Sequence, residues 1–131
     1  MLLKADILPD EIAIFVRSKA QMPRARAVFK RTAIEWTELE RTNLAPPGKV
    51  SLSTMHLAKG LEFRAVIVMA CDHDIIPLSE RIEIAADEYE LEETFNTERH
   101  LLYVAATRAR EQLYLTGVDP ISEFVEDMRQ G

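Results

Sequence analysis

The stretch Ala65-Val66-Ile67-Val68-Met69-Ala70 is apolar at every position. A strand with one face in water alternates apolar and polar residues, so a short run without alternation is typical of a strand covered on both faces. Such strands occur in parallel sheets that carry helices on both sides. The stretch therefore predicts a layered α/β domain with this strand inside its sheet.

The segments around this strand extend the same pattern. The sequence predicts further strands over 11–17, 34–39, 50–55 and 112–116. It predicts helices over 21–31 and 120–128, and one long helix or two helices over 87–110. A turn is expected over 43–49, and an irregular stretch over 71–86. Because strands alternate with helices, the sheet should be largely parallel, with ligands at the carboxyl ends of its strands.

Composition narrows the class of protein. A chain of 131 residues fits one domain over 1–131, and 47% hydrophobic residues exclude a disordered chain. One cysteine excludes an internal disulfide, and the three histidines give no zinc-site spacing. No signal peptide or bilayer-length apolar run is present, so we expect a cytoplasmic protein without a membrane partner. A net charge of −6 argues against stand-alone nucleic-acid binding, except through a local patch or a larger assembly.

The first candidate site is the segment from Ser53 to Phe63, which follows a predicted strand. It contains Thr54, His56, Lys59, Gly60 and Glu62. Hydroxyl, imidazole and ammonium groups can contact phosphate oxygens, and glycine permits a tight backbone path. A carboxylate there could accept hydrogen bonds from a ribose hydroxyl, as in dinucleotide sites. The alternative is an ordinary β–α connection with a solvated face.

The second candidate is Thr107-Arg108, near the end of the apolar helix-period run Glu98 to Arg110. A guanidinium among core residues costs desolvation unless it has an anionic partner. An arginine finger that neutralises charge on a γ-phosphoryl group would supply that partner. The alternative is a helix C-terminal arginine facing carbonyl groups and solvent.

The third candidate is Cys71-Asp72-His73-Asp74, which invites a metal or nuclease interpretation. Consecutive side chains at a strand end point in alternating directions, so they do not converge on one ion. Loop residues with solvated carboxylates are the favoured interpretation, and no metal site is predicted. A nuclease function through Asp72 and Asp74 ranks third among the functional hypotheses.

A phosphate-binding P-loop is absent from the sequence. None of the four glycines lies in a G-x-x-x-x-G-K-[ST] arrangement, and no acidic strand-end pair suggests a magnesium site. An ATPase active site therefore cannot be completed from this chain alone.

Two motifs taken together resemble one known family. Residues 54–63 (TMHLAKGLEF) resemble motif V of superfamily 1 helicases of the UvrD/Rep/PcrA type, and residues 98–109 (ERHLLYVAATRA) resemble motif VI. Residues 12–18 (IAIFVRS) are similar to the strand that opens this half of the family's motor. The motifs occur in the family's order, and the resemblance covers nearly the whole chain.

The resemblance implies a fold, and it implies that the ATP site is shared between two domains. It implies the C-terminal RecA-like domain of a 3′-to-5′ DNA helicase, a three-layer α/β domain that lacks its own P-loop. ATP with Mg²⁺ would be held mainly by an N-terminal RecA-like domain of the same parent protein. Arg108 would contact the γ-phosphate and Glu62 the ribose, with Lys59 and Gly60 beside the nucleotide.

Other positions carry supporting roles in the same comparison. Thr54 and His56 would face single-stranded DNA and relay the nucleotide state to it. Tyr103 would pack near Arg108 as a support, and Thr107 would share that role.

The chain departs from the family pattern in three ways. The first motor domain is missing, so we expect a fragment or a separately expressed domain. Only about twenty residues, Lys30 to Lys49, separate the predicted helix over 21–31 from motif V, too few for the family's large accessory insert. Motif VI usually begins Glu-Glu-Arg-Arg, whereas residues 97–100 here are Thr-Glu-Arg-His.

Two functional hypotheses follow from these observations. In the first, the chain completes an ATP site and grips single-stranded DNA, and it is inactive in isolation. In the second, it keeps the motor fold but serves as a non-catalytic scaffold in a DNA repair complex.

Overall fold

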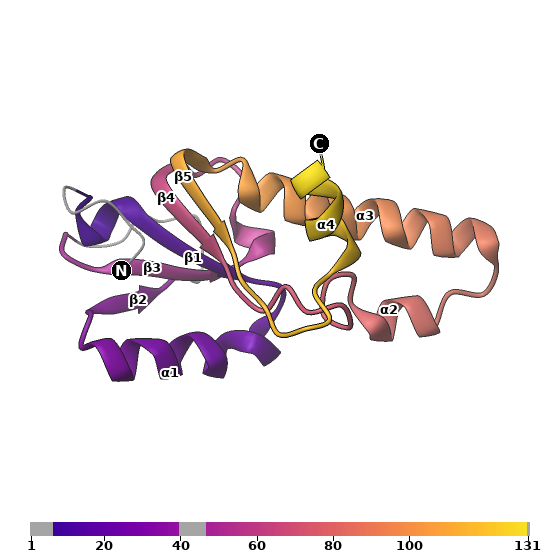
Figure 1. The fold of residues 1–131 in the computed structure, drawn as a ribbon, viewed down its shortest axis with the longest axis horizontal. Helices are drawn as coiled ribbons and strands as arrows, with labels where there is room; N and C mark the ends of the chain where they lie inside the picture. Colours follow the sequence, from indigo (N-terminus) through magenta and orange to yellow (C-terminus); the bar gives the residue numbers. More distant parts are fainter. Residues whose placement is uncertain (1–6, 40–46, 131) are drawn as a thin grey trace.

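A computed structural model, which describes residues 7–39 and 47–130, has a five-stranded parallel sheet between two helical layers (Figure 1). The spatial order of the strands is β2-β3-β1-β4-β5, and every neighbouring pair is parallel. The strands are β1 (Ile12–Val16), β2 (Trp36–Glu38), β3 (Val50–Thr54), β4 (Phe63–Val68) and β5 (Ala109–Leu115). The predicted parallel α/β fold is confirmed.

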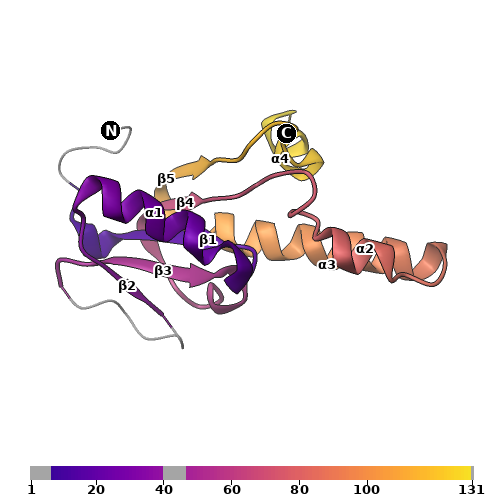
Figure 2. The ribbon, with the colours of Figure 1, turned by 90° about the horizontal axis from the view of Figure 1, so that it is seen from below.

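Helices cover both faces of the sheet. The helix α1 (Met22–Thr32) lies on one face, and α3 (Glu88–Ala106) with α4 (Glu123–Gln130) lies on the other (Figures 1 and 2). Three short 3-10 turns, η1 (Pro9–Glu11), η2 (Lys19–Gln21) and η3 (Met55–Leu57), connect elements near the ends of strands.

Each face of the sheet carries its own apolar core. On the α1 face, Met22, Ala25 and Phe29 pack against the strands, and the Phe29 ring stacks on Trp36 at a centroid distance of 5.2 Å. On the other face, Leu102 and Phe124 belong to the larger cluster. Burial of every residue of β1 follows from this double cover, because β1 is the central strand.

The strand predicted over 65–70 is confirmed as β4, although β4 begins and ends two residues earlier. Its register shifts between Phe63 and Ala65 opposite β5. The shift lets Phe63 and Val66 pack into the same core although they are three residues apart.

The helical prediction over 87–110 is right for most of its length and wrong at its end. The helix α3 ends at Ala106, and β5 has already begun at Ala109. The irregular stretch expected over 71–86 also contains a short helix, α2 (Ser79–Glu83). The helix α2 and the first turns of α3 extend beyond the sheet as an arm (Figures 1 and 2).

The N-terminus of α3 is capped in both directions. Asp87 accepts a hydrogen bond from the Glu90 backbone N–H at 2.9 Å, and Glu90 Oε2 accepts one from the Ala86 N–H at 2.6 Å. Reciprocal bonds of this kind satisfy backbone donors that a helix start leaves unpaired. They fix where the arm turns back toward the sheet.

The predicted turn and the predicted lack of a membrane span can be compared only with the described residues. The turn predicted over 43–49 is seen at Pro47-Gly48, with Gly48 at φ +83°, whereas residues 43–46 lie outside the described part. Within residues 7–39 and 47–130, no helix is both long and apolar enough to cross a bilayer.

Candidate nucleotide and DNA site

The two sequence motifs meet at the amino-terminal edge of the sheet. The backbone N–H of Phe63 donates to the carbonyl oxygen of Arg108 at 2.9 Å, and Phe63 pairs with Ala109 in the β4–β5 ladder. Glu62 and Arg108 are therefore neighbours in space although they are far apart in sequence. Glu62 is exposed and Arg108 is half-buried, so both side chains reach the surface from this edge of the sheet.

The end of α3 holds the guanidinium of Arg108. Its Nε donates to the Val104 carbonyl oxygen at 3.0 Å, and its Nη2 lies 3.4 Å from Thr107 Oγ1. The last carbonyls of a helix carry partial negative charge, which favours a cation there. Within the described part of the chain no carboxylate pairs with Arg108. The guanidinium is thus held in place while much of its hydrogen-bonding capacity is left for another group.

The loop that carries motif V alternates buried anchors with exposed polar groups. Met55, Ala58 and Leu61 are buried in the core, whereas His56, Lys59, Gly60 and Glu62 are exposed. Gly60 adopts φ +83°, a left-handed conformation that suits glycine, and a Cβ there would meet no atom within 4 Å. The glycine therefore serves the backbone path of the loop and does not make room for packing.

Thr54 and His56 lie at the opposite, carboxyl edge of the sheet, because they follow the end of β3. Thr54 lines a hollow of about 270 Å³ together with Lys19 and Leu57. The site residues predicted from sequence are accordingly divided between two edges. The expectation that ligands gather at the carboxyl ends of the strands does not describe the Glu62–Arg108 pair.

A buried ion-pair hub at the carboxyl edge was missed by the sequence analysis. Glu98 accepts from Arg17 Nε at 2.8 Å and from Arg17 Nη2 at 2.6 Å. It also accepts from the Leu78 N–H at 2.8 Å and from Arg81 Nη1 at 2.9 Å. These bonds join the end of β1, the segment before α2, α2 itself and α3. The sequence carried two signals of this hub. Arg17 ends the apolar run of β1, and Glu98 lies on the inner stripe of α3.

The charges of this hub act on neighbouring groups. Burial alone would raise the pKa of Glu98, but the bonds from Arg17, Leu78 and Arg81 outweigh burial, so the pKa lies below its ordinary value. The pKa of His56 is also lowered, first by partial burial and then by the Arg17 charge. His56 is therefore mostly neutral at pH 7 and able to act as a hydrogen-bonding group.

The side chain of Tyr103 faces a groove other than the Glu62–Arg108 edge. Its side chain is exposed and lines a small groove between α3 and α4, together with Arg99 and Phe124. The Arg99 guanidinium lies 4.8 Å from the centroid of the Phe124 ring. The Tyr103 backbone carbonyl accepts from the Thr107 N–H at 2.9 Å, so Tyr103 contributes to the turn that precedes Arg108.

Asp72 has a structural role. The prediction that its carboxylate is solvated is wrong. Its carboxylate accepts from Arg24 Nη1 at 2.8 Å and from the Val118 N–H at 2.8 Å, which connects α1 with the segment that follows β5. Asp74 is exposed, as expected. Among the described residues, no group of three or more histidine, cysteine or acidic side chains could hold a metal ion.

A scan against protein families matches residues 9–119 to the UvrD-like helicase C-terminal domain. The chain belongs to this family. The match spans both edges of the sheet described above, and it supports the resemblance drawn from the two motifs.

Individual relatives of this UvrD-like domain are bacterial helicases. The ATP-dependent DNA helicase PcrA of Staphylococcus epidermidis is 46% identical over 67 residues, which are 51% of this chain and 8% of that protein. PcrA of Staphylococcus aureus is 45% identical over the same shares. The chain therefore spans less than a tenth of the length of these relatives.

A solved structure has the same fold as the UvrD-like domain. The C-terminal domain of a possible DNA helicase from Lactobacillus plantarum matches with a TM-score of 0.58 and 29% identity, covering 88% of this chain and 61% of that one. The predicted RecA-like helicase C-terminal fold is confirmed by this likeness and by the parallel sheet.

Proposed function

We propose that the chain is the second half of an ATP-driven motor that moves 3′ to 5′ along single-stranded DNA. Membership of the UvrD-like family supports helicase function for the parent protein. The observation that carries the proposal is the Phe63–Arg108 backbone bond, since it joins the two motifs at one edge. An N-terminal RecA-like domain would supply the P-loop and face this edge.

The residues at this edge suit a nucleotide. Arg108, fixed by the Val104 carbonyl, can neutralise charge on the γ-phosphate, and exposed Glu62 can accept a hydrogen bond from a ribose hydroxyl. Lys59 and Gly60 lie in the same loop, and Thr107 steadies the turn before Arg108. When bound, ATP supplies the phosphoanhydride whose cleavage drives movement. Mg²⁺ would be held by the other domain, because no three histidine, cysteine or acidic side chains among the described residues are arranged to hold a metal ion.

The loop between the two edges can couple nucleotide to DNA. Residues 54–62 run as one connection from the carboxyl end of β3 to the amino-terminal start of β4. Its buried anchors make it a packed element, so a shift at Glu62 is transmitted toward Thr54 and His56. Neutral His56 and the Thr54 hydroxyl can then donate to or accept from the DNA strand.

Substitution of Arg108 in the full-length parent protein tests this proposal. Arg108→Ala should lower DNA-stimulated ATP hydrolysis about a thousandfold or more, because arginine fingers contribute that much to kcat. Arg110→Ala is the matched control, since Arg110 is exposed on β5 two residues later, and its activity should stay near that of the wild type. The isolated chain should hydrolyse little ATP. Turnover by the chain alone that survives Arg108→Ala contradicts the proposal.

The scaffold hypothesis is supported by one observation. Arg108 already bonds to the carbonyl of its own helix, as an ordinary C-terminal arginine does. If ATP hydrolysis by the parent protein is unchanged in Arg108→Ala while its repair complex still assembles, the scaffold is the correct function.

A further inference from the structure

The charge of this chain is concentrated on the arm. We define the acidic arm as residues 80–93, which include most of α2 and the first turns of α3. It contains seven acidic residues and one basic residue, so its net charge of −6 equals that of the whole chain; the remaining residues carry fifteen of each sign. All seven acidic side chains are exposed. The rest of the molecule carries no net charge, and the arm provides a strong negative field.

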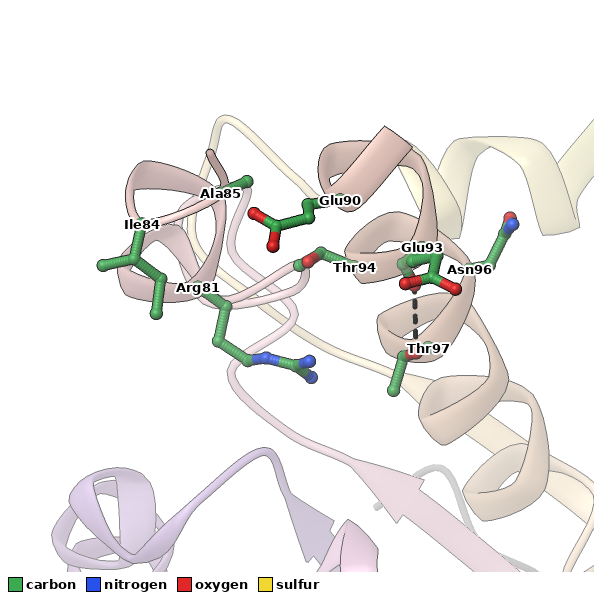
Figure 3. A pocket seen from close by; sticks show the side chains of 8 residues that line it. All are labelled: Arg81, Ile84, Ala85, Glu90, Glu93, Thr94, Asn96 and Thr97. Atoms are coloured by element: carbon green, nitrogen blue, oxygen red, sulfur yellow. Dashed lines mark hydrogen bonds between the residues drawn. The ribbon is translucent and has the colours of Figure 1, made fainter. Parts of the chain in front are cut away.

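A groove of about 610 Å³ lies between α2 and α3 on this arm (Figure 3). Its walls combine two glutamates, the Arg81 guanidinium and three neutral polar side chains with the aliphatic groups of Ile84 and Ala85. Figure 3 shows Arg81 pointing from α2 toward α3, with Glu90 reaching back toward Ala85 and with Glu93 and Thr94 along the helix. Arg81 is paired with Glu98, so the Glu90 and Glu93 carboxylates are the charges that the groove offers beside its aliphatic surface.

Large apolar side chains are exposed at the same place. Ile84 lines the groove and is 79% exposed, and Tyr89 is 70% exposed, the two highest values among large hydrophobic residues of the described part. A single exposed apolar residue is ordinary, whereas apolar groups with a groove and a charged rim are typical of interaction sites. Neither side chain has a packing role in the domain cores.

The arm is held in position before any partner arrives. The Arg81–Glu98 pair and the Leu78 N–H bond to Glu98 attach the α2 region to the buried hub. The capping bonds of Asp87 and Glu90 fix the turn between the helices. A surface that is ordered in advance loses less entropy when it binds.

We propose that the acidic arm is a docking site for a basic polypeptide segment that carries an apolar side chain. Charge complementarity selects the occupant: lysine or arginine heads would meet Glu90 and Glu93, with their aliphatic stems along Ala85 and Thr94. The apolar side chain would cover Ile84. Nucleic acid is the wrong occupant, because its phosphates would be repelled by seven exposed carboxylates. The arm stands apart from the Glu62–Arg108 edge, so this inference does not depend on the proposed ATP site.

Binding of a short lysine-rich peptide with one leucine tests the proposal, with affinity measured by fluorescence anisotropy on the 131-residue chain. The affinity should fall with added salt, because the attraction is electrostatic. Glu93→Gln should weaken binding about fivefold, and Ile84→Ser about tenfold. Glu92→Gln is the matched control, since Glu92 is exposed on the same helix but does not line the groove; its effect should stay within about twofold. Circular dichroism checks that each variant keeps its helices.

Three outcomes would overturn the proposal. Equal losses in Glu92→Gln and Glu93→Gln would show diffuse charge attraction without a docking groove. Equal binding of the same peptide with serine in place of leucine would remove the role of Ile84. Binding of a single-stranded oligonucleotide that is lost in Glu93→Gln and Ile84→Ser would identify the wrong class of partner.

Discussion

Removal of the Glu98 carboxylate should destabilise the domain strongly. Glu98 is 1% exposed, and it accepts four hydrogen bonds, two of them from Arg17, which is itself 4% exposed. Glu98→Ala leaves the Arg17 guanidinium buried without a partner, which costs about 3–5 kcal/mol. Whole domains are stable by only about 5–15 kcal/mol, so this is a large share. Urea unfolding followed by circular dichroism measures the change as a lower midpoint at a similar slope.

Two further variants decide whether the reasoning about Glu98 is right. Glu92→Ala, on the exposed side of the same helix, should change the free energy of unfolding by no more than about 0.5 kcal/mol. The double variant Arg17→Met with Glu98→Leu should recover much of the loss, because no charge is then left buried without its partner. A Glu98→Ala domain within about 0.5 kcal/mol of the wild type would refute the account of the hub.

The same hub predicts a dependence of stability on pH. The folded pKa of Glu98 lies below its ordinary value of 4.5, so folding favours the ionised carboxylate. Its contribution to stability is fully present above pH 4.5 and is lost as the pH falls from there through the folded pKa. Unfolding midpoints measured across this acid range should fall less steeply in the Arg17→Met/Glu98→Leu variant. An equal fall in both proteins would contradict the assignment.

Three more predictions follow from other sites. Burial first, then the Arg17 charge and in smaller part the Arg81 charge lower the pKa of His56, so this pKa should rise in Arg81→Ala, as followed by NMR; an unchanged or lower value would contradict the hub geometry. Gly117→Ala should destabilise the domain by about 1–3 kcal/mol in urea, since its Cβ would lie 2.8 Å from a backbone carbonyl carbon; a neutral result would contradict this contact. Asp72→Ala should lower stability by about 1–3 kcal/mol through loss of its bonds to Arg24 and to a backbone N–H, without affecting any metal-dependent cleavage; cleavage activity lost with Asp72 would revive the nuclease hypothesis.

Local patterns predicted most of the elements in this fold. The uninterrupted apolar run from Ala65 was enough to place a strand inside a parallel sheet, because only double cover accommodates such a run. The end of α3 was predicted four residues too late. Ala109 continues the helical spacing of Ala105, yet backbone pairing of Arg108 with Phe63 begins β5 there. Tertiary pairing, which the local pattern does not contain, decides this boundary.

The residues of the candidate site could be proposed from the sequence, but their arrangement could not. The motifs point to Glu62 and Arg108 as candidates, whereas their meeting at the amino-terminal edge depends on strand order, which local spacing does not encode. Arg17 and Glu98 are separated by 81 positions, so no sequence window contains both. In the sequence, each is a charged residue among apolar neighbours. This pattern indicates that a buried partner exists, but it does not tell which residue the partner is.

The most direct test of the central claim is the affinity of the full-length parent protein for ADP with aluminium fluoride, an analogue of the transferring phosphoryl group. If Arg108 meets the γ-phosphate, Arg108→Ala should weaken binding of this analogue about a hundredfold or more while binding of ADP alone changes little. Arg110→Ala should bind both as the wild type does. Equal affinity of the wild type and Arg108→Ala for the analogue would contradict the account.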